Sequence, residues 1–419
     1  MNIQINREII RSKYLQELIE MQDKHFIKVI TGVRRSGKSI ILQQFKKHLL
    51  ETGIDKKQII EYDFNDVALQ KLTYEKLHEE IISCSIKNKT NYLLLDEVQD
   101  IDSFEKAIIS LFENKIIKYD IYITGSNSRM FSNQLATLFT GRNIELKVFP
   151  LSFKDFYDFN IKYYYDNKDR LGVNKNPLFL QYLKYGGLPI LLENMENNKI
   201  KEKQLSHVLY DTIEKDIRNR HVIKNIPEFD RVSKYILCES GKEISVVNTA
   251  NYLKSNEKSK ISHVTIERYL NWLQDALLIY KAEMYDIRGK RTLKTTAKYF
   301  AVDSGIKNIQ DNFNSWDTGY TLESIVYIEL LRREYQVYIG KLRNGEIDFV
   351  CKNNKGDITY IQVTKTLKDG GDKKLWDREV GNLSSIKDNF EKIVISYEDQ
   401  GKILPNGIKI MNLIDWLLE

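Results

Sequence analysis

The sequence is poor in the features that mark several classes of protein. Its three cysteines, Cys84, Cys238 and Cys351, lie far apart and give neither a disulfide framework nor the spacing of a metal site. With 20 Gly and 5 Pro among 419 residues, it has no Gly-rich stretch that would act as a flexible linker. No run approaches 18 consecutive apolar residues, and the first residues contain no apolar signal segment. We therefore expect a cytoplasmic protein with no membrane partner.

A strong excess of charge of one sign is also lacking. The formal net charge of +6 is modest for this length and does not by itself indicate nucleic acid binding. Between Arg231 and Asp303, however, 13 Lys and Arg stand against 8 Asp and Glu. A polyanionic partner is therefore expected in this region first. With 42% hydrophobic and 29% charged residues, the chain is otherwise typical of a globular protein of roughly two to four domains.

One short segment carries the strongest motif. Residues 28–42 are predicted to form an apolar strand, a loop with the spacing G-x-x-x-x-G-K-S, and an amphipathic helix. In this order the motif predicts a nucleotide site, because glycine lets the loop curl around a phosphate and the helix dipole points its positive end at the same anion. Lys38 would reach the β- and γ-phosphates, and Ser39 would bind Mg²⁺. The residues expected to bind ATP are Gly32, Val33, Arg34, Arg35, Ser36, Gly37, Lys38, Ser39 and Ile40.

A second apolar run, residues 91–99, contains two adjacent carboxylates, Asp96 and Glu97. Continuous apolar runs are typical of buried parallel strands, whose carboxyl ends form the ligand-binding edge of a sheet. In a protein with a phosphate loop, Asp96 is predicted to hold Mg²⁺ through water and Glu97 to activate the attacking water. Lys38 is then the second catalytic residue. A further strand is predicted between the two motifs, as in ATPases that carry an additional strand and a glutamate after the aspartate.

Three further residues are candidates for sensing the nucleotide. The predicted strand at 119–128 ends near Ser126 and Asn127, which would lie between Glu97 and the γ-phosphate. The alternative for these two residues is an ordinary strand-to-helix turn. Arg142 follows in a loop, where its guanidinium would stabilise transition-state charge in its own or a neighbouring active site. The alternative for Arg142 is a salt bridge that braces the loop.

Together these motifs resemble one family of prokaryotic AAA+-type ATPases. The stretches that carry the resemblance are G-x-R-R-x-G-K-S, L-L-L-D-E-V-Q, I-T-G-S-N-S, and G-R followed by P-L-S-F-x-x-F. The resemblance covers nearly the whole chain and implies an ATP-binding protein with an AAA+ core. The C-terminal region of this family is described as uncharacterised, so the resemblance implies no role for that region.

Residues 161–230 are predicted to form a helical lid and residues 231–303 a winged helix. Arg218 and Arg220 lie on a lid helix, where a solvated charged face is expected rather than a nucleotide contact. In the winged helix, the longer helix would read a DNA groove and a basic hairpin tip would contact phosphates. Winged helices also bind proteins, so DNA and a protein are both retained as partners of the C-terminal half. The tip residues are Arg288, Lys290 and Arg291.

The last segment resembles the PD-(D/E)XK nuclease core, with Glu323 on a helix and Asp348 on a strand. On the third predicted strand, Gln362 stands where an acid is expected and Thr364 where the lysine is expected. Gln is a weak ligand for a hard cation, and Thr carries no positive charge. Lys365, one residue later, would point to the opposite face of the strand. We therefore expect a nuclease-like fold with a degenerate site formed by Glu323, Asp348 and Gln362.

The predicted fold is a multidomain α/β protein. A parallel-sheet P-loop ATPase core over residues 1–160 is followed by the helical lid, the winged helix and a restriction-endonuclease-like domain over residues 304–419. The predicted function is Mg²⁺-dependent ATP binding and hydrolysis that drives a conformational change in the C-terminal half. An ATP-gated nuclease and a nucleotide-switched DNA- or protein-binding regulator with little turnover are the alternatives. The lack of an N-K-x-D-like guanine motif favours ATP over GTP, and an oligomer is allowed.

Overall fold

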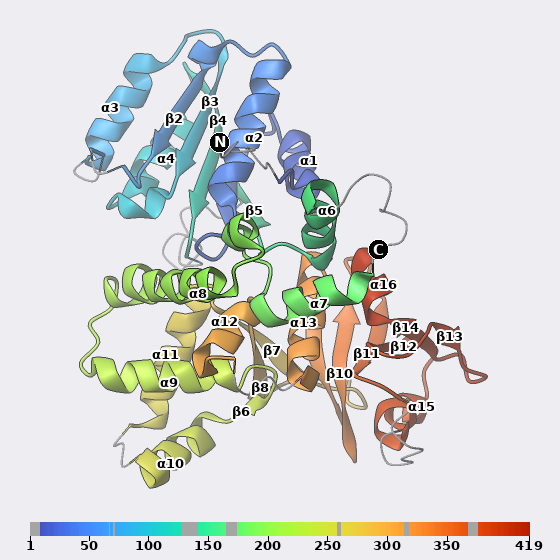
Figure 1. Ribbon diagram of the computed structural model, residues 1–419. Helices are drawn as coiled ribbons and strands as arrows, with labels where there is room; N and C mark the ends of the chain where they lie inside the picture. The colour runs from blue at the N-terminus through green and yellow to red at the C-terminus, as the bar shows by residue number, and fades with distance from the viewer. Residues whose placement is uncertain are drawn as a thin grey trace. The chain divides into compact units, whose positions relative to one another are not determined.

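The computed structural model describes residues 9–66, 68–69, 72–127, 141–164, 174–257, 261–313, 318–367 and 376–419. They form two compact units (Figure 1). The first unit contains the chain up to Val148 together with Asp275–Leu277, and the second contains the remaining residues. The ATPase core was predicted to extend to residue 160, and this boundary stays a prediction. Phe153, which follows Val148, belongs to the second unit and packs edge-on against Phe179, with ring centroids 5.4 Å apart.

The first unit is built on a five-stranded sheet in the order β2-β3-β4-β1-β5, and every strand pair is parallel. β4 lies between β1 and β3, so the two strands that carry the nucleotide motifs are not neighbours. Their carboxyl ends nevertheless lie at the same edge, because the strands are parallel. The strands are β1 (Ile27–Thr31), β2 (Ile59–Asp63), β3 (Thr90–Asp96), β4 (Lys118–Gly125) and β5 (Asn143–Lys147).

Helices cover both faces of this sheet. Side chains alternate along β3, so Leu93 and Leu95 pack in one apolar cluster and Tyr92 and Leu94 in another. The first cluster includes residues of α3 (Tyr74–Cys84) and α4 (Phe104–Phe112), and the second includes residues of α1 (Ser12–Glu20) and α2 (Lys38–Glu51). Because both faces are covered, β3 is apolar at successive positions rather than at alternate ones.

The second unit is built on one mixed sheet of nine strands, in the order β13-β14-β12-β11-β10-β9-β7-β8-β6. β7 pairs in parallel with β9, with Met284 opposite Ile339, and this pair joins two groups of strands that lie apart in the sequence. The strands are β6 (Glu243–Ile244), β7 (Ile279–Asp286), β8 (Arg291–Ala301), β9 (Gln336–Leu342), β10 (Gly345–Lys352), β11 (Ile358–Thr364), β12 (Glu391–Ser396), β13 (Lys402–Ile403) and β14 (Lys409–Asn412).

The sheet therefore crosses the boundary predicted between residues 303 and 304. The order β6, α10, α11, β7, β8 is the one expected for the predicted winged helix, whose assignment stays a prediction. The hairpin is tighter than expected, because β8 begins at Arg291 and leaves only residues 287–290 for the turn. The helices before this hairpin are α6 (Phe153–Tyr164), α7 (Lys175–Tyr185), α8 (Asn198–Thr212), α9 (Ile226–Cys238), α10 (Val246–Glu257) and α11 (His263–Asp275).

Helix α13 (Thr318–Arg332) packs on strands from both groups, β8 to β11 (Figure 1). Tyr327 of α13 stacks on Phe300 of β8, with ring centroids 4.2 Å apart, and Phe300 and Tyr327 both contact the ring of Phe349 on β10. The hairpin strand β8 thus shares one core with the nuclease-like segment. The remaining helices are α12 (Ser304–Asn308), α15 (Asn382–Ser385), α16 (Leu413–Leu418) and the π-helical turns η6 (Ile213–Arg218) and η8 (Asp377–Gly381).

The helices of the described residues are too short or too polar to cross a membrane.

Candidate functional site

The predicted phosphate loop connects β1 to α2. A Cβ atom on Gly32 would overlap the carbonyl oxygen of Val148, so only glycine fits at this position. Gly37 precedes α2 with φ of 100°, in the left-handed region that glycine adopts without strain. No side chain caps the first turn of α2. The backbone N–H groups at this helix end are therefore suited to binding an anion.

Lys38 is the first residue of α2, and only 3% of its surface is exposed. Its ammonium donates to the carbonyl oxygen of Gly32 at 3.0 Å and lies 3.2 Å from Oε1 of Glu97. The structure thus brings together the phosphate-binding lysine and the predicted general base, which are 59 positions apart in the sequence. Glu97 is thus the ion-pair partner of Lys38.

Asp96 ends β3, and both it and Glu97 are buried. The Thr124 hydroxyl on β4 connects them, since it donates to the Asp96 carboxylate and accepts the N–H of Glu97 at 2.9 Å. Burial raises the pKa of Asp96, and hydrogen bonds from Ser39 and Thr124 oppose this shift. Ser39 and Asp96 therefore lie side by side, as two oxygen ligands of one Mg²⁺ must.

Glu97 is held ionised in spite of its burial. Burial is the largest single influence and would raise the pKa, but Lys38, Gln99 and Arg34 together lower the pKa of Glu97 to about 2. The residue has φ of 55°, an uncommon left-handed conformation for a non-glycine residue, which turns the chain directly after β3. A carboxylate that stays ionised at neutral pH has the charge state that a general base requires.

The two predicted sensor residues, Ser126 and Asn127, are both buried beyond the end of β4. The Ser126 hydroxyl lies 3.4 Å from Nε2 of Gln99, which in turn donates to the Glu97 carboxylate. It also lies 3.5 Å from the guanidinium of Arg34 in the phosphate loop. Ser126 is therefore close to Glu97 without contacting it directly. Thr124, which was not predicted, contacts both Asp96 and Glu97. Its position two residues before Ser126, on the same side of the strand, is the signal that would have identified it.

Arg142 lies at the other end of the strands. Its carbonyl oxygen accepts the N–H of Ile27, the first residue of β1, and its guanidinium pairs with Glu113 at 2.8 Å. The phosphate loop follows the last residue of β1, one strand length away. Arg142 therefore lies too far from the phosphate loop to act in the site of its own chain. Its pair with Glu113 corresponds to the alternative, a salt bridge that braces the loop. A role in a neighbouring subunit stays a prediction.

Arg11 was not recognised from the sequence. It precedes α1, is 4% exposed, and donates to the carbonyl oxygen of Ser36 in the phosphate loop at 3.2 Å. Its guanidinium also stacks over the ring of Tyr14 at 4.5 Å. The hydroxyl of Ser36 is buried and has no hydrogen-bond partner within the described residues. The loop thus contains an unsatisfied polar atom and an adjacent positive charge, which fit an anionic ligand.

The predicted nuclease-like residues form a second group in the second unit. Glu323 on α13 and Asp348 on β10 surround a lysine that was not predicted, Lys298 on β8. Its ammonium lies 3.5 Å from Glu323 and 2.6 Å from Glu346. The nuclease motif has its lysine on the third strand, whereas Lys298 belongs to the hairpin that precedes the nuclease-like segment.

The degenerate nuclease site that was expected on the third strand of that segment stays a prediction. The Gln362 side-chain oxygen lies 3.4 Å from the N–H of Asp348, and the Thr364 hydroxyl donates to the carbonyl of Thr366. Lys365 is on the opposite side of the strand, where it is exposed and lies 3.6 Å from Glu398. The described residues contain no group of three or more Asp, Glu, His or Cys side chains placed to hold a metal ion.

The basic residues Arg288, Lys290 and Arg291 are exposed at the hairpin turn. Asp286 holds this turn, because its carboxylate accepts the N–H groups of Arg288 at 3.1 Å and Gly289 at 3.0 Å. Contact of the turn with DNA stays a prediction. Among the lid arginines, Arg218 pairs with Glu214 and Asp230, as expected for a charged helix face.

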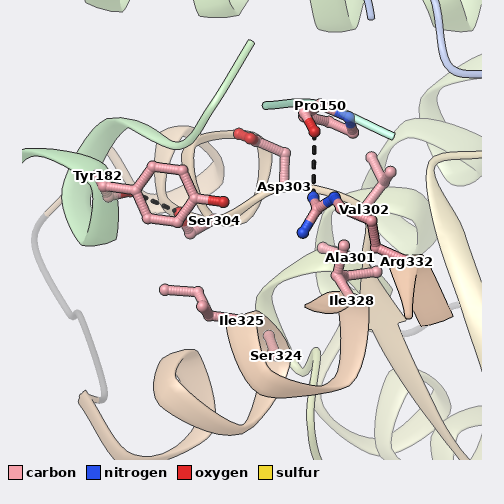
Figure 2. A pocket seen from close by; sticks show the side chains of 10 residues that line it. All are labelled: Pro150, Tyr182, Ala301, Val302, Asp303, Ser304, Ser324, Ile325, Ile328 and Arg332. Carbon is pink, nitrogen blue, oxygen red and sulfur yellow. Dashed lines mark hydrogen bonds between the residues drawn. The ribbon is translucent and has the colours of Figure 1, made fainter. Parts of the chain in front are cut away.

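A small pocket lies between α7, α12 and α13 (Figure 2). Asp303 lines it, and its carboxylate accepts the N–H groups of Gly187 at 2.7 Å and Gly305 at 2.9 Å. Burial raises the pKa of Asp303 to about 6, although these amides and Arg332 act in the opposite direction. Arg332 also donates to the carbonyl of Pro150 at 3.1 Å, as Figure 2 shows. The lining residues are Pro150, Tyr182, Ala301, Val302, Asp303, Ser304, Ser324, Ile325, Ile328 and Arg332.

The chain is similar to known families and proteins over most of its length. The model of a family described as an AAA domain matches residues 24–157, and that of a domain of unknown function matches residues 176–317. An uncharacterized protein of Haemophilus influenzae is 38% identical over 98% of this chain and 99% of its own length. An uncharacterized protein of Methanocaldococcus jannaschii is 32% identical over 90% of this chain and 83% of its own length.

Comparison with solved structures confirms the predicted α/β P-loop NTPase fold. A Walker-type ATPase of Pyrococcus abyssi superposes with a TM-score of 0.51 and 16% identity, covering 73% of this chain and 96% of that protein. At this level of identity the likeness concerns the fold alone.

Proposed function

We propose that this chain, which belongs to one family with its Haemophilus influenzae relative and matches an AAA domain over residues 24–157, binds ATP with Mg²⁺ and hydrolyses it to drive a change in its second unit. The observation that carries the proposal is the contact between Lys38 and Glu97 beside Asp96. These are the charged groups that phosphate binding, water activation and Mg²⁺ binding require, and they meet at the carboxyl edge of the sheet.

Binding begins with an exchange of partners at Lys38. The γ-phosphate brings negative charge to the loop, and the Lys38 ammonium leaves Glu97 to pair with it. The N–H groups of residues 32–39 and the first turn of α2 bind the phosphate oxygens. Ser39 and Asp96 are the residues that would hold Mg²⁺, and the ion would neutralise phosphate charge.

Hydrolysis needs Glu97 to accept a proton from water. Release of Lys38 removes the nearest positive charge from Glu97, which raises the pKa of this carboxyl and makes it a stronger base. Gln99 and the Thr124 hydroxyl keep the residue in place meanwhile, since they contact its carboxylate and its N–H. Glu97 would thus become a stronger base only after a phosphate has replaced its carboxylate as the partner of Lys38.

The connection between the two units supports coupling. The carbonyl of Val148 lies against Gly32 of the phosphate loop, and the N–H of Val148 donates to Thr31 at 2.6 Å. Two residues later, the carbonyl of Pro150 accepts the hydrogen bond from Arg332 on α13. A movement of the loop is therefore passed along three covalently linked residues to the helix that packs on the nine-stranded sheet.

We further propose that the second unit binds a partner, DNA or a protein, and does not cleave DNA. The exposed basic hairpin supports a polyanionic partner. The orientation of Lys365, together with Gln362 and Thr364 in place of an acid and a lysine, supports the absence of cleavage. Incubation with linear and supercoiled DNA in Mg²⁺ or Mn²⁺, with and without ATP, tests this. Cleavage that Asp348→Ala abolishes would show that the unit is a nuclease.

The decisive experiment for ATP hydrolysis is phosphate release by the purified chain, with and without Mg²⁺ and with and without DNA. Glu97→Gln keeps the shape of the site but cannot accept a proton, so turnover should fall by about 100-fold or more while ATP binding remains. Lys47→Ala, an exposed lysine on the same helix as Lys38, serves as the matched control. Unchanged turnover in Glu97→Gln would exclude Glu97 as the base.

A further inference from the structure

Lys298 is surrounded by carboxylates that come from three different elements. Glu323 belongs to α13, and Glu346 and Asp348 belong to β10. Glu379, on η8, contributes a fourth negative charge that acts on both Glu323 and Asp348. A β-bulge between Ile347 and Val350 interrupts the pairing of β10 with β9 at Asp348. Such bulges re-aim a side chain, and here the Asp348 carboxylate accepts the N–H of Val363 at 2.7 Å.

The position of Lys298 does not suit contact with an external phosphate. Only 7% of its side chain is exposed, and its ammonium already pairs with two carboxylates. β8 is held on both sides, with Lys298 opposite Ala282 of β7 and Glu243 of β6. Moving the lysine out would therefore break strand pairing and leave the acids without their counter-ion.

We propose that Lys298 is an internal cation that takes the place of a divalent metal in this acid cluster, so that the cluster fastens β8 to α13 and β10 instead of binding metal. These three elements also share one aromatic core, which is formed by Phe300 of β8, Tyr327 of α13 and Phe349 of β10. The ion pairs and the apolar contacts thus hold the same three elements together.

The remaining charges of the cluster agree with this role. Lys298 and Arg378, which pairs with Glu379, are two cations beside four carboxyl groups. Burial, opposed by Lys298, raises the pKa of Glu323 to about 7. Burial and the Glu323 charge raise the pKa of Asp348 as well. One oxygen of Glu379 accepts from Arg378, while the other is buried without a hydrogen-bond partner within the described residues. The cluster holds excess negative charge, and loss of Lys298 would leave it open to a cation.

The first test is a double-mutant cycle on the melting temperature of the full chain. Lys298→Met keeps the length of the side chain and removes its charge, which should lower the melting temperature by on the order of 10 °C. Adding Glu323→Gln replaces the acid that Lys298→Met leaves without its counter-ion, and it should restore part of the loss. Lys281→Met, a half-exposed lysine of β7 that pairs with Glu283, is the matched control and should change little.

The outcomes of the cycle separate charge from packing. Lys298→Arg should retain most of the stability, because it keeps the positive charge. If Lys298→Met fails to fold, the double variant decides, since a folded Lys298→Met/Glu323→Gln protein supports the role of charge. Additive losses, or a double variant that also fails to fold, would overturn the proposal, because a lysine that acts only by packing gives that result.

The second test uses Mn²⁺ without nucleotide. Mn²⁺ should raise the melting temperature of Lys298→Met and should not do so when Asp348→Asn is added. Failure of Mn²⁺ to stabilise Lys298→Met would overturn the replacement of metal by lysine. Stabilisation of the unsubstituted chain that Asp348→Asn abolishes would also overturn it, because the cluster would then be a metal site. None of these results depends on ATP hydrolysis, so the proposed ATPase activity can fail or stand independently.

Discussion

Lys38 and Lys298 are both buried beside carboxylates, and their surroundings give opposite results. Lys38 faces a single carboxylate, and in spite of burial the pKa of Glu97 is lowered to about 2, with Gln99 and Arg34 assisting. Lys298 faces several carboxylates, and burial raises the pKa of Glu323 to about 7 although Lys298 opposes the shift. Between these two acids, the difference follows from the charges around them, because several groups stabilise the ionised form of Glu97 whereas Glu323 has further carboxylates beside it.

The two lysines also differ in what holds them. Lys38 begins a helix next to a loop, where no side chain caps the helix, so its ammonium can change partner when a phosphate arrives. Lys298 lies inside a strand that is paired on both sides. One ion pair is therefore built to exchange and the other to persist. This difference is what the following substitutions test.

The largest effect is expected from removing the charge of Lys38. Lys38→Met should weaken ATP binding by about 100-fold or more, because a charge-assisted contact to the phosphates is lost in a buried site. Lys298→Met should leave the ATP dissociation constant unchanged. Titration with a fluorescent ATP analogue measures both. Equal losses in the two variants would contradict the assignment of Lys38 as the residue that exchanges its partner.

Asp303 provides a third case, a buried carboxylate served mainly by backbone N–H groups. Its pKa is raised to about 6 in the folded chain, above the ordinary value of 3.8. The folded state therefore holds the proton more tightly, and the stabilisation is fully present below pH 3.8 and is lost as the pH rises to 6. The loss amounts to about 3 kcal/mol.

The measurement is urea unfolding between pH 4 and pH 7, taken as the difference between the unsubstituted chain and Asp303→Asn. That difference isolates Asp303 from Glu323, whose raised pKa acts in the same direction, and from Arg332 and Tyr182, which stay charged and neutral respectively in this range. A difference that does not change with pH would show that Asp303 is ionised throughout, and that the N–H groups alone satisfy it.

A smaller effect is expected at Thr124. Thr124→Val keeps the shape but removes the hydroxyl that connects Asp96 and the N–H of Glu97, so turnover should fall by about tenfold. The melting temperature should fall only slightly. Ser110→Ala, which removes a hydroxyl bonded to His78 on the surface, is the control. Full activity in Thr124→Val would mean that Asp96 and Glu97 are positioned without it.

The smallest effect is expected at the hairpin turn. Reversing Arg288, Lys290 and Arg291 to Glu should weaken DNA binding and reduce its dependence on salt, because fewer counterions are released. ATP hydrolysis without DNA should not change. Reversal of Lys47, Lys56 and Lys57, which are exposed on the first unit, is the control. Equal losses in both variants would indicate unspecific attraction instead of a site at the turn.

The loop after β1 and the two acids after β3 were predictable, because each belongs to a short motif. The contact between Lys38 and Glu97 follows from the motifs only because parallel strands bring their carboxyl ends to one edge of the sheet. The side of the strand on which Lys365 lies also followed, from the period of two residues in a strand.

Residues that arrive from distant parts of the chain were not predictable in this way. Arg11, Thr124 and Lys298 belong to elements whose contacts depend on tertiary packing, and none carries a motif of its own. The packing of Phe153 on a helix that begins more than twenty positions later was not predicted for the same reason. The pairing of β7 with β9 crosses the boundary predicted between residues 303 and 304, and no local sequence pattern indicates this pairing.

That pairing limits how the protein can be divided for experiments. A fragment ending at residue 303 would keep β7 but lose β9, and the backbone N–H and C=O groups of β7 would form an open edge that invites aggregation. A fragment starting at residue 304 would lack Lys298 and leave the acids of α13 and β10 facing each other. Deletion of either part would therefore disrupt the nine-stranded sheet itself. The roles of the two halves of the second unit are better tested by single substitutions than by truncation.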